Sequence, residues 1–267
     1  EEGMCFFFEH TEGNHCLVIS DKSSIFVDIS GDATVPYRSR DNMVEDEGTE
    51  AIYDLRYSKS VRSGKVSIQD YEFKRPSTSL ATNSAASEET DLEVYDYPGE
   101  YFVKGDGDVL AKIRLEELRT SKVSIWGFSG CRRFLPGFKF TLAEHPRDDR
   151  NAQYLITRVE HWGNQPEASE EDAGATGAGG SSEEEAPYGN RFESLPGDVA
   201  YRPARVTPRP RVDGPHTAMV VGPPGEEIWP DEHGRVKVQF HWDRLGANDD
   251  KSSCWIRVSQ GWAGLGM

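Results

Sequence analysis

The chain has 267 residues, of which 36% are hydrophobic and 28% are charged, so it is long enough for two domains with a sizeable buried core. Its formal net charge of -16 argues against nucleic acid as the main partner, because phosphate binding depends on clustered Lys and Arg. No hydrophobic signal segment opens the sequence, and its apolar runs are far shorter than the ~20 residues that span a bilayer. Four scattered cysteines without a CxxC pair indicate free thiols in a reducing cytoplasm.

The first part of the chain predicts β-hairpins. Short aromatic and β-branched runs fill residues 4–29 and are separated by turn-forming sequences. If residues 11–14 form a four-residue turn, His10 faces His15 across the hairpin. Residues 30–60 are polar and weakly patterned.

Next comes a strand and then a long loop. Val66 and Ile68 alternate with polar residues, as in a half-buried strand. Residues 76–91 are rich in Ser, Thr and Ala, which predicts an extended loop.

One helix is predicted, at about residues 107–120. Asp106 or Asp108 can accept hydrogen bonds from the free amides at its start. Its apolar residues fall near one face, namely Val109, Leu110, Ile113 and Leu118. Alternating apolar residues at 138–142 and the run at 152–162 then predict two strands.

Composition also divides the chain. Residues 163–189 contain seven acidic residues and no Lys or Arg, which predicts a mobile segment, either a linker or a loop between strands. The Pro-rich segment 207–215 reads as an extended connector, which places a domain boundary at 205/206. Beyond it, residues 236–242 and 254–258 alternate as two amphipathic strands. The fold class is therefore mainly β with few helices.

A zinc site is the first chemical possibility, because Cys and His pairs suit tetrahedral zinc. The candidates are Cys5, His10, His15 and Cys16. Strand alternation, however, puts the two cysteines on one face of the hairpin and the two histidines on the other. The sequence therefore predicts no zinc site here.

A hydrolase site is the second possibility. Three histidines lie among carboxylates near the C-terminus: His216, His233 and His241 with Glu226, Glu227, Asp231, Glu232 and Asp243. No HExxH, GxSxG or phosphate-binding loop is present, and such residues around a turn are usually solvated. We therefore predict no catalytic, cofactor-binding or metal-binding residues, no cofactor and no enzymatic activity.

Single-strand nucleic-acid binding by an oligonucleotide-binding (OB) barrel is the third possibility. Four aromatic residues could stack bases: Phe240, Trp242, Trp255 and Trp262. Residues 206–267, however, carry seven Lys or Arg against eight Asp or Glu, so the segment has no excess of positive charge to attract a phosphate backbone. Packing of these aromatic side chains in a core is the favoured interpretation.

Several ordered motifs resemble the VgrG family of type VI secretion spike proteins. The longest runs from GPHTAMVVGPPGEEIWPDEHGRVKVQFHWDRLGANDD to KSSCWIRVSQGWAG and looks like the family's OB-fold signature. Upstream, FFFEHTEGNHCLVISD, GKVSIQDYEFKRPS, CRRFLPGFKFTL, YLITRVEHW and RPARVTPRPRVDGP resemble the family's body, which is similar to a contractile-phage tail hub. The resemblance covers nearly the whole chain.

The resemblance implies phage-tail-hub-like β-barrel domains over residues 1–205 and an OB-fold barrel over 206–267. It makes 163–189 an inserted loop between two strands rather than a linker. It also implies a homotrimer seated on a hexameric, Hcp-like tube protein, with a PAAR-like tip protein and effector cargo carried by a C-terminal needle. Such a spike is assembled in the bacterial cytoplasm, is exported by the machine without a signal peptide and touches the target membrane transiently.

The resemblance also predicts what is missing. By comparison with the family, we expect the chain to lack the N-terminal part of the hub and to end at Met267 before the OB barrel is complete and before any needle. Two alternatives stay open: a tail spike or baseplate hub of a prophage or related contractile particle, and an OB-fold single-strand nucleic-acid-binding module.

Overall fold

The computed structural model describes residues 2–39, 50–163, 188–226 and 229–259. The chain forms two compact units, Glu1–Val206 and Thr207–Met267. Strands dominate, and α1 (Lys104–Thr120) is the only α-helix within the described residues. This confirms the predicted mainly-β class.

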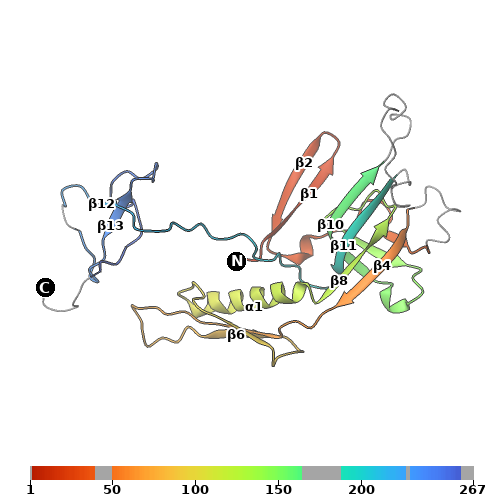
Figure 1. Ribbon diagram of the computed structural model, residues 1–267, viewed down its shortest axis with the longest axis horizontal. Helices are drawn as coiled ribbons and strands as arrows, with labels where there is room; N and C mark the ends of the chain where they lie inside the picture. Colours follow the sequence, from red (N-terminus) through yellow and green to blue (C-terminus); the bar gives the residue numbers. More distant parts are fainter. Residues whose placement is uncertain (1, 40–49, 164–187, 227–228, 260–267) are drawn as a thin grey trace. The chain divides into compact units, whose positions relative to one another are not determined.

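Six strands form the main sheet of the first unit, in the order β3-β9-β10-β11-β8-β4 (Figure 1). Their bounds are β3 Thr34–Pro36, β4 Ile52–Lys59, β8 Val123–Ser129, β9 Lys139–Ala143, β10 Gln153–Gly163 and β11 Tyr188–Pro196. Neighbours are antiparallel, apart from the parallel pair β3 and β9. The predicted strands at 138–142 and 152–162 are confirmed as β9 and β10 in the middle of this sheet.

The long strands β10 and β11 pair with each other up to Gly163 opposite Tyr188. The two chain segments that flank residues 164–187 are therefore neighbouring strands. Gly163, Tyr188 and Gly189 belong to these strands, so the predicted loop at 163–189 is too long at both ends. Residues 164–187 lie outside the described residues.

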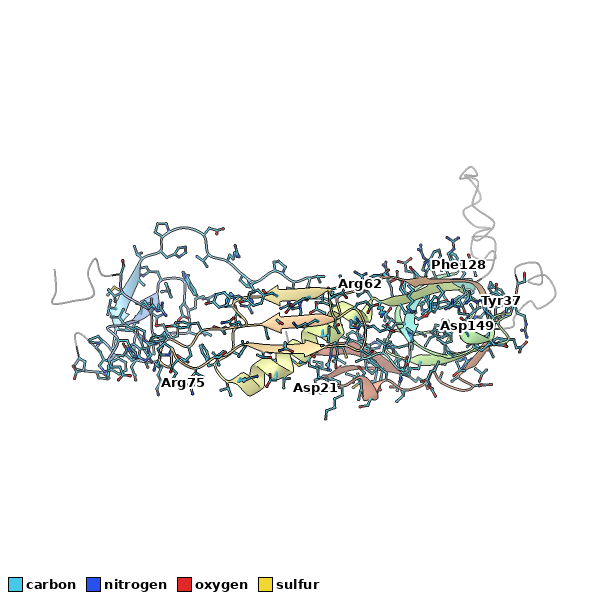
Figure 2. All side chains as sticks on the ribbon, turned by 90° about the horizontal axis from the view of Figure 1, so that it is seen from below. Asp21, Tyr37, Arg62, Arg75, Phe128 and Asp149 are labelled. Atoms are coloured by element: carbon cyan, nitrogen blue, oxygen red, sulfur yellow. The ribbon has the colours of Figure 1, made fainter. Side chains whose placement is uncertain are left out.

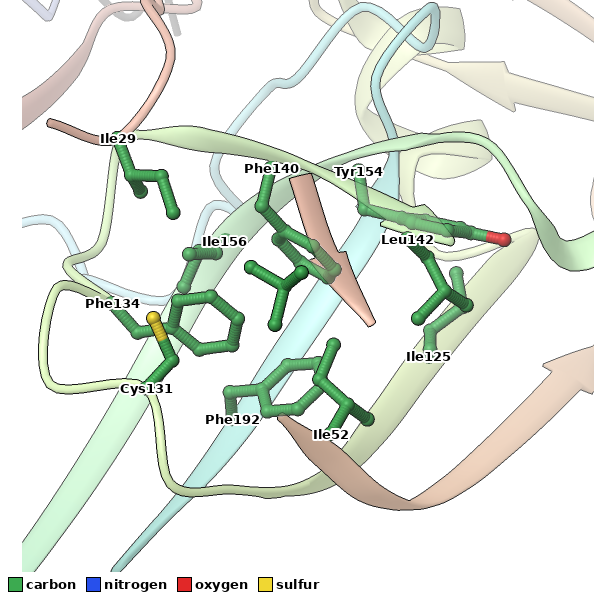
Figure 3. Close-up of a cluster of buried hydrophobic side chains, with 11 residues drawn as sticks. Ile29, Ile52, Ile125, Cys131, Phe134, Phe140, Leu142, Tyr154, Ile156 and Phe192 are labelled. Atoms are coloured by element: carbon green, nitrogen blue, oxygen red, sulfur yellow. The ribbon is translucent and has the colours of Figure 1, made fainter. Parts of the chain in front are cut away.

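An aromatic cluster forms the core of this sheet (Figure 3). Phe140 and Leu142 of β9 are buried, as their alternation with polar residues predicts. The Phe140 ring centroid lies 4.8 Å from that of Phe134, 5.6 Å from that of Phe192 and 5.7 Å from that of Tyr154. Edge-to-face and tilted contacts of this kind add to the stabilisation from burial.

Strands β1 (Cys5–Thr11) and β2 (Asn14–Ser20) form a separate hairpin (Figure 1). His10 pairs with His15, so the predicted register is confirmed, and Gly13 adopts the left-handed φ of +76° that the turn requires. The inner face of the hairpin packs Cys5 and Phe7 against a cluster that includes Leu155 of β10. A short 3-10 helix, Ser23–Ile25, follows, and another covers Asp148–Arg150.

A second sheet, in the order β6-β5-β7, lies against α1 (Figure 2). Its strands are β5 Lys65–Ile68, β6 Thr82–Ala85 and β7 Glu93–Asp96. Val66 and Ile68 are buried with Tyr101, whose hydroxyl lies against the carbonyl oxygens of Ile68 and Leu80. The strand predicted around Val66 is confirmed, but the loop predicted for 76–91 is wrong because it contains β6.

Helix α1 begins earlier than predicted, and its predicted apolar face is confirmed in part, because Leu110 and Leu118 pack against the buried cluster of the second sheet. Its N-cap is Val103, without a side-chain cap, and Asp108 instead pairs with the Lys104 ammonium at 3.0 Å. The buried residues are Gly107, Ala111 and Leu115, while Val109 is exposed. Because Gly107 and Ala111 are small, the helix can approach the sheet closely.

The second unit contains the antiparallel strands β12 (Ala218–Val221) and β13 (Lys237–Phe240). The strand predicted at 236–242 is therefore shorter, and the one predicted at 254–258 is reduced to a single bridge between Val236 and Ile256.

The aromatic residues of this unit form two pairs. Phe240 stacks on Trp242 with 5.0 Å between ring centroids, and Trp229 packs on Trp255 at 4.8 Å. Trp242 is 59% exposed, so the prediction of core packing is wrong for this side chain. Trp262 lies outside the described residues.

The turn before β13 is held by Asp231. Burial opposes ionisation of its carboxyl, but the Arg235 side chain at 2.6 Å and the backbone amides of Arg235 and His233 donate to it and lower its pKa to about 2. A depressed carboxyl pKa gives stability that is present above the ordinary value of 3.8 and is lost as pH falls through about 2.

We expect Arg235→Met to raise the pKa of Asp231 toward 3.8, because the substitution removes the guanidinium donor. NMR titration of the Asp231 carboxyl measures this change directly. Arg244→Met, at an exposed arginine of the same unit, is the control and should leave the titration unchanged. An unshifted Asp231 in Arg235→Met would contradict the role given to the guanidinium.

Candidate assembly surface

The candidate zinc ligands do not form one site. Cys5 pairs with Ser20 and Glu9 pairs with Cys16, so both cysteines lie on the opposite face of the hairpin from His10 and His15. Within the described residues, no group of three or more His, Cys, Asp or Glu side chains is placed to hold a metal ion.

The candidate hydrolase residues form no metal-holding group of three within the described residues, although His233 lies 3.4 Å from the Glu232 carboxylate. His216, His233 and His241 are exposed. The Asp243 carboxylate accepts from the backbone amides of Leu245 and Gly246, so it caps a turn, as Asp231 does. Glu227 lies outside the described residues. The carboxylates of Asp231 and Asp243 therefore both support turns.

The buried cysteines are poor nucleophiles. Burial raises the pKa of the Cys131 thiol to about 11, and it also raises the pKa of Cys5. Because the thiolate is the reactive form, both side chains are neutral and inert near pH 7.

The most unusual surface is the outer face of the β1–β2 hairpin. Phe6 is 69% exposed and pairs with Ile19, which is 61% exposed. Phe8 pairs in the same way with Leu17, and Met4 extends the face at its base. We call these five residues the hairpin face. Exposed apolar side chains that gather in this way mark interaction sites on soluble proteins.

A groove of about 520 Å³ runs beside the hairpin face. Phe6, Phe8 and His10 form part of its wall, and Leu135, Pro136 and Tyr201 form another part. The aromatic and aliphatic lining gives the groove the character of a pocket for apolar side chains of a partner.

Sequence reasoning did not identify the hairpin face, although a signal was present. Phe6, Phe7 and Phe8 are consecutive, so a strand must point them to both of its faces. Phe7 is buried, which leaves Phe6 and Phe8 on the side away from the core.

Comparison with known proteins identifies the family. A family model described as phage tail baseplate hub (GPD) matches residues 1–167, which form most of the first unit. The chain therefore belongs to the phage tail baseplate hub (GPD) family.

Within this family the chain is similar to spike proteins of type VI secretion. It is 39% identical over 267 residues to the type VI secretion system spike protein VgrG1b of Pseudomonas aeruginosa. The matched region covers 99% of this chain and 34% of the relative. VgrG2a of the same organism is 40% identical over 272 residues, covering 99% of this chain and 31% of the relative. The resemblance to the VgrG family is thus confirmed, and the chain spans about a third of the length of these relatives.

A solved structure supports the fold. The E. coli c3393 protein is a type VI secretion component with structural similarity to the T4 bacteriophage tail proteins gp27 and gp5. It superposes with a TM-score of 0.51 at 17% identity, covering 90% of this chain and 46% of that one. At this identity the likeness shows the fold alone.

Proposed function

We propose that the chain is part of the trimeric spike hub of a type VI secretion system, with a mechanical and docking role and no catalytic one. The observation that carries the proposal is the 39% identity to a VgrG spike protein along nearly the whole chain. It favours this function over a nucleic-acid-binding module. A prophage tail hub shares the architecture and is the second candidate, since the matching family model describes a phage tail hub.

In this proposal residues 1–205 form the hub body and residues 206–267 belong to an OB-fold domain. The hub sits on a hexameric, Hcp-like tube protein, and a PAAR-like tip protein and effectors are carried at the other end. The machine exports the assembled spike. Within the described part of the chain, no helix has the length and apolar character needed to cross a membrane.

The hairpin face is the surface that we assign to contact between copies of the chain. Fully burying a large apolar side chain contributes roughly 1.5–3 kcal/mol, so the four half-exposed side chains of the two cross-strand pairs would contribute about 3–6 kcal/mol. Association itself costs roughly 4–15 kcal/mol. The hairpin face is therefore one part of a larger interface, which would continue into the apolar groove that Met4, Phe6 and Phe8 also line.

We expect the double variant Phe6→Glu and Ile19→Glu to reduce self-association strongly, because each contact would bury two carboxylates without partners. Sedimentation velocity over a wide range of protein concentration measures this. The unaltered chain should approach a trimer, and the variant should stay at the monomer mass of 29.9 kDa.

Val61→Glu is the matched control, because Val61 is 73% exposed in the same unit and outside the hairpin face. It should associate as the unaltered chain does. A chain that stays monomeric at the highest concentration would count against the trimeric hub. If the double variant still forms a trimer, the interface must lie on another surface of the chain.

A further inference from the structure

The tip of the β1–β2 hairpin carries a closely spaced histidine pair. The Nδ1 atoms of His10 and His15 lie 3.1 Å apart, and the two ring centroids are 5.2 Å apart. Both rings are exposed on the side of the hairpin that carries Phe8, whose ring stacks on His10 with 6.3 Å between centroids. Direct opposition in the strand register holds the two imidazoles together.

We propose that His10 and His15 form a two-nitrogen binding site for a divalent transition-metal ion, which bridges β1 and β2. For metal–nitrogen bonds of about 2.0–2.1 Å, two nitrogens lie roughly 3.3–3.4 Å apart at a tetrahedral angle and roughly 2.9 Å apart at a right angle. The 3.1 Å separation lies between these values. The pair therefore has the spacing of a chelate before any metal binds.

A hydrogen-bonded pair of imidazoles can bind a metal without a net loss of protons. A contact between two Nδ1 atoms requires that one carries the proton and the other offers its lone pair. When a metal binds, both Nδ1 lone pairs coordinate it, and the proton moves from Nδ1 to Nε2 of the same ring. Two neutral imidazoles thus become two ligands without a net loss of protons.

The neighbouring groups do not compete for the ion. Glu9 and Cys16 point to the opposite face of the hairpin, and Glu12 lies in the turn. The groove that His10 borders has Cys5 and Tyr201 as its other titratable residues and no carboxylate in its lining. The site therefore consists of imidazole nitrogens and water.

This ligand set selects a class of ion. Imidazole suits Cu²⁺, Ni²⁺ and Zn²⁺, whereas Mg²⁺ and Ca²⁺ prefer carboxylate and carbonyl oxygens. The protein fills two positions, so water occupies the rest of the coordination sphere. The bound ion would cross-link β1 and β2, the two strands that carry the hairpin face. The site goes beyond the proposed function and does not depend on it.

Calorimetric titration of the full, tag-free chain with NiCl2 tests the site. We expect one ion per chain at neutral pH. His10→Gln and His15→Gln should each weaken binding at least about tenfold, the lower bound seen when even a supporting residue of a metal site is removed. His241→Gln, at an exposed single histidine, is the control and should bind as the unaltered chain does.

Electron paramagnetic resonance of the Cu²⁺-loaded chain gives a second readout. The unaltered protein should show two equatorial nitrogen ligands, and each hairpin variant should show one fewer. Both residues are exposed, so the metal-free unfolding midpoint should stay within error in the variants. Nickel binding that survives His10→Gln, or a copper spectrum that neither variant changes, would overturn the proposal and indicate adventitious binding elsewhere.

Discussion

Phe140→Ala is expected to lower the free energy of unfolding by about 3–5 kcal/mol. Phe140 is fully buried, and its ring contacts those of Phe134, Tyr154 and Phe192. The residues around it come from β9, β10, β11 and the segment before β9, so the cavity cannot close without moving several strands at once. A domain is typically stable by only 5–15 kcal/mol, so this loss would be a large part of the total. Urea denaturation followed by circular dichroism measures it.

Phe102→Ala is the matched control, because it removes the same ring from a side chain that is 62% exposed. Its effect should stay within about 0.5 kcal/mol. Equal losses for the two variants would contradict the assignment of the aromatic cluster as the core of the main sheet. The slope of free energy against urea should be unchanged in both, since the surface exposed on unfolding is nearly the same.

Two glycine substitutions in helix α1 are expected to change stability in opposite directions. A Cβ at Gly107 would lie 2.4 Å from the Tyr101 ring and 2.6 Å from the Thr82 methyl group. Tyr101 cannot easily retreat, because its hydroxyl is held by the carbonyl oxygens of Ile68 and Leu80. Gly107→Ala should therefore cost about 1–3 kcal/mol, as overpacking in a core does.

Gly105→Ala is the counterpart, two residues earlier in the same helix. A Cβ there meets nothing within 4 Å, so the substitution should stabilise by about 0.5 kcal/mol through the higher helix propensity of Ala. Thermal unfolding midpoints of the two variants should move apart, downward for the first and upward for the second. A stabilising Gly107→Ala would mean that the helix lies farther from its sheet than the structure places it.

Two inner strands of the main sheet, β9 and β10, could be predicted from the sequence, and β9 has a clear periodicity. Phe140 and Leu142 alternate with polar residues, and both are buried. The turn at residues 11–14 likewise determined the pairing of His10 with His15. In each case a local pattern and the final packing agree.

The strands that were missed have patterns interrupted by their surroundings. In β4, Ile52, Leu55 and Tyr57 all belong to the core region, but their spacing of three and then two breaks the alternation. A β-bulge between Ile52 and Asp54 explains the change of phase. In β6, Thr82 is buried beneath α1 without being hydrophobic, so composition favours a loop.

The sequence predicted which hairpin residues share a face, but it did not predict which of these faces is exposed. Alternation alone separates the cysteines of the hairpin from its histidines, because two faces of one strand are a local property. Whether the outer face of that strand is covered depends on packing with other parts of the molecule. The exposed Phe6 and Trp242 therefore had to be seen in the structure.

The pairing of β10 with β11 has a consequence for how such chains diversify. The ladder closes at Gly163 and Tyr188, so the segment between these residues joins two strand ends that are already held side by side. Doubling the number of residues that connect two such strand ends costs only about 0.6 kcal/mol in loop-closure entropy. Insertions and deletions can accumulate there over evolution while the sheet stays intact, and the same position is a natural graft point for an added peptide.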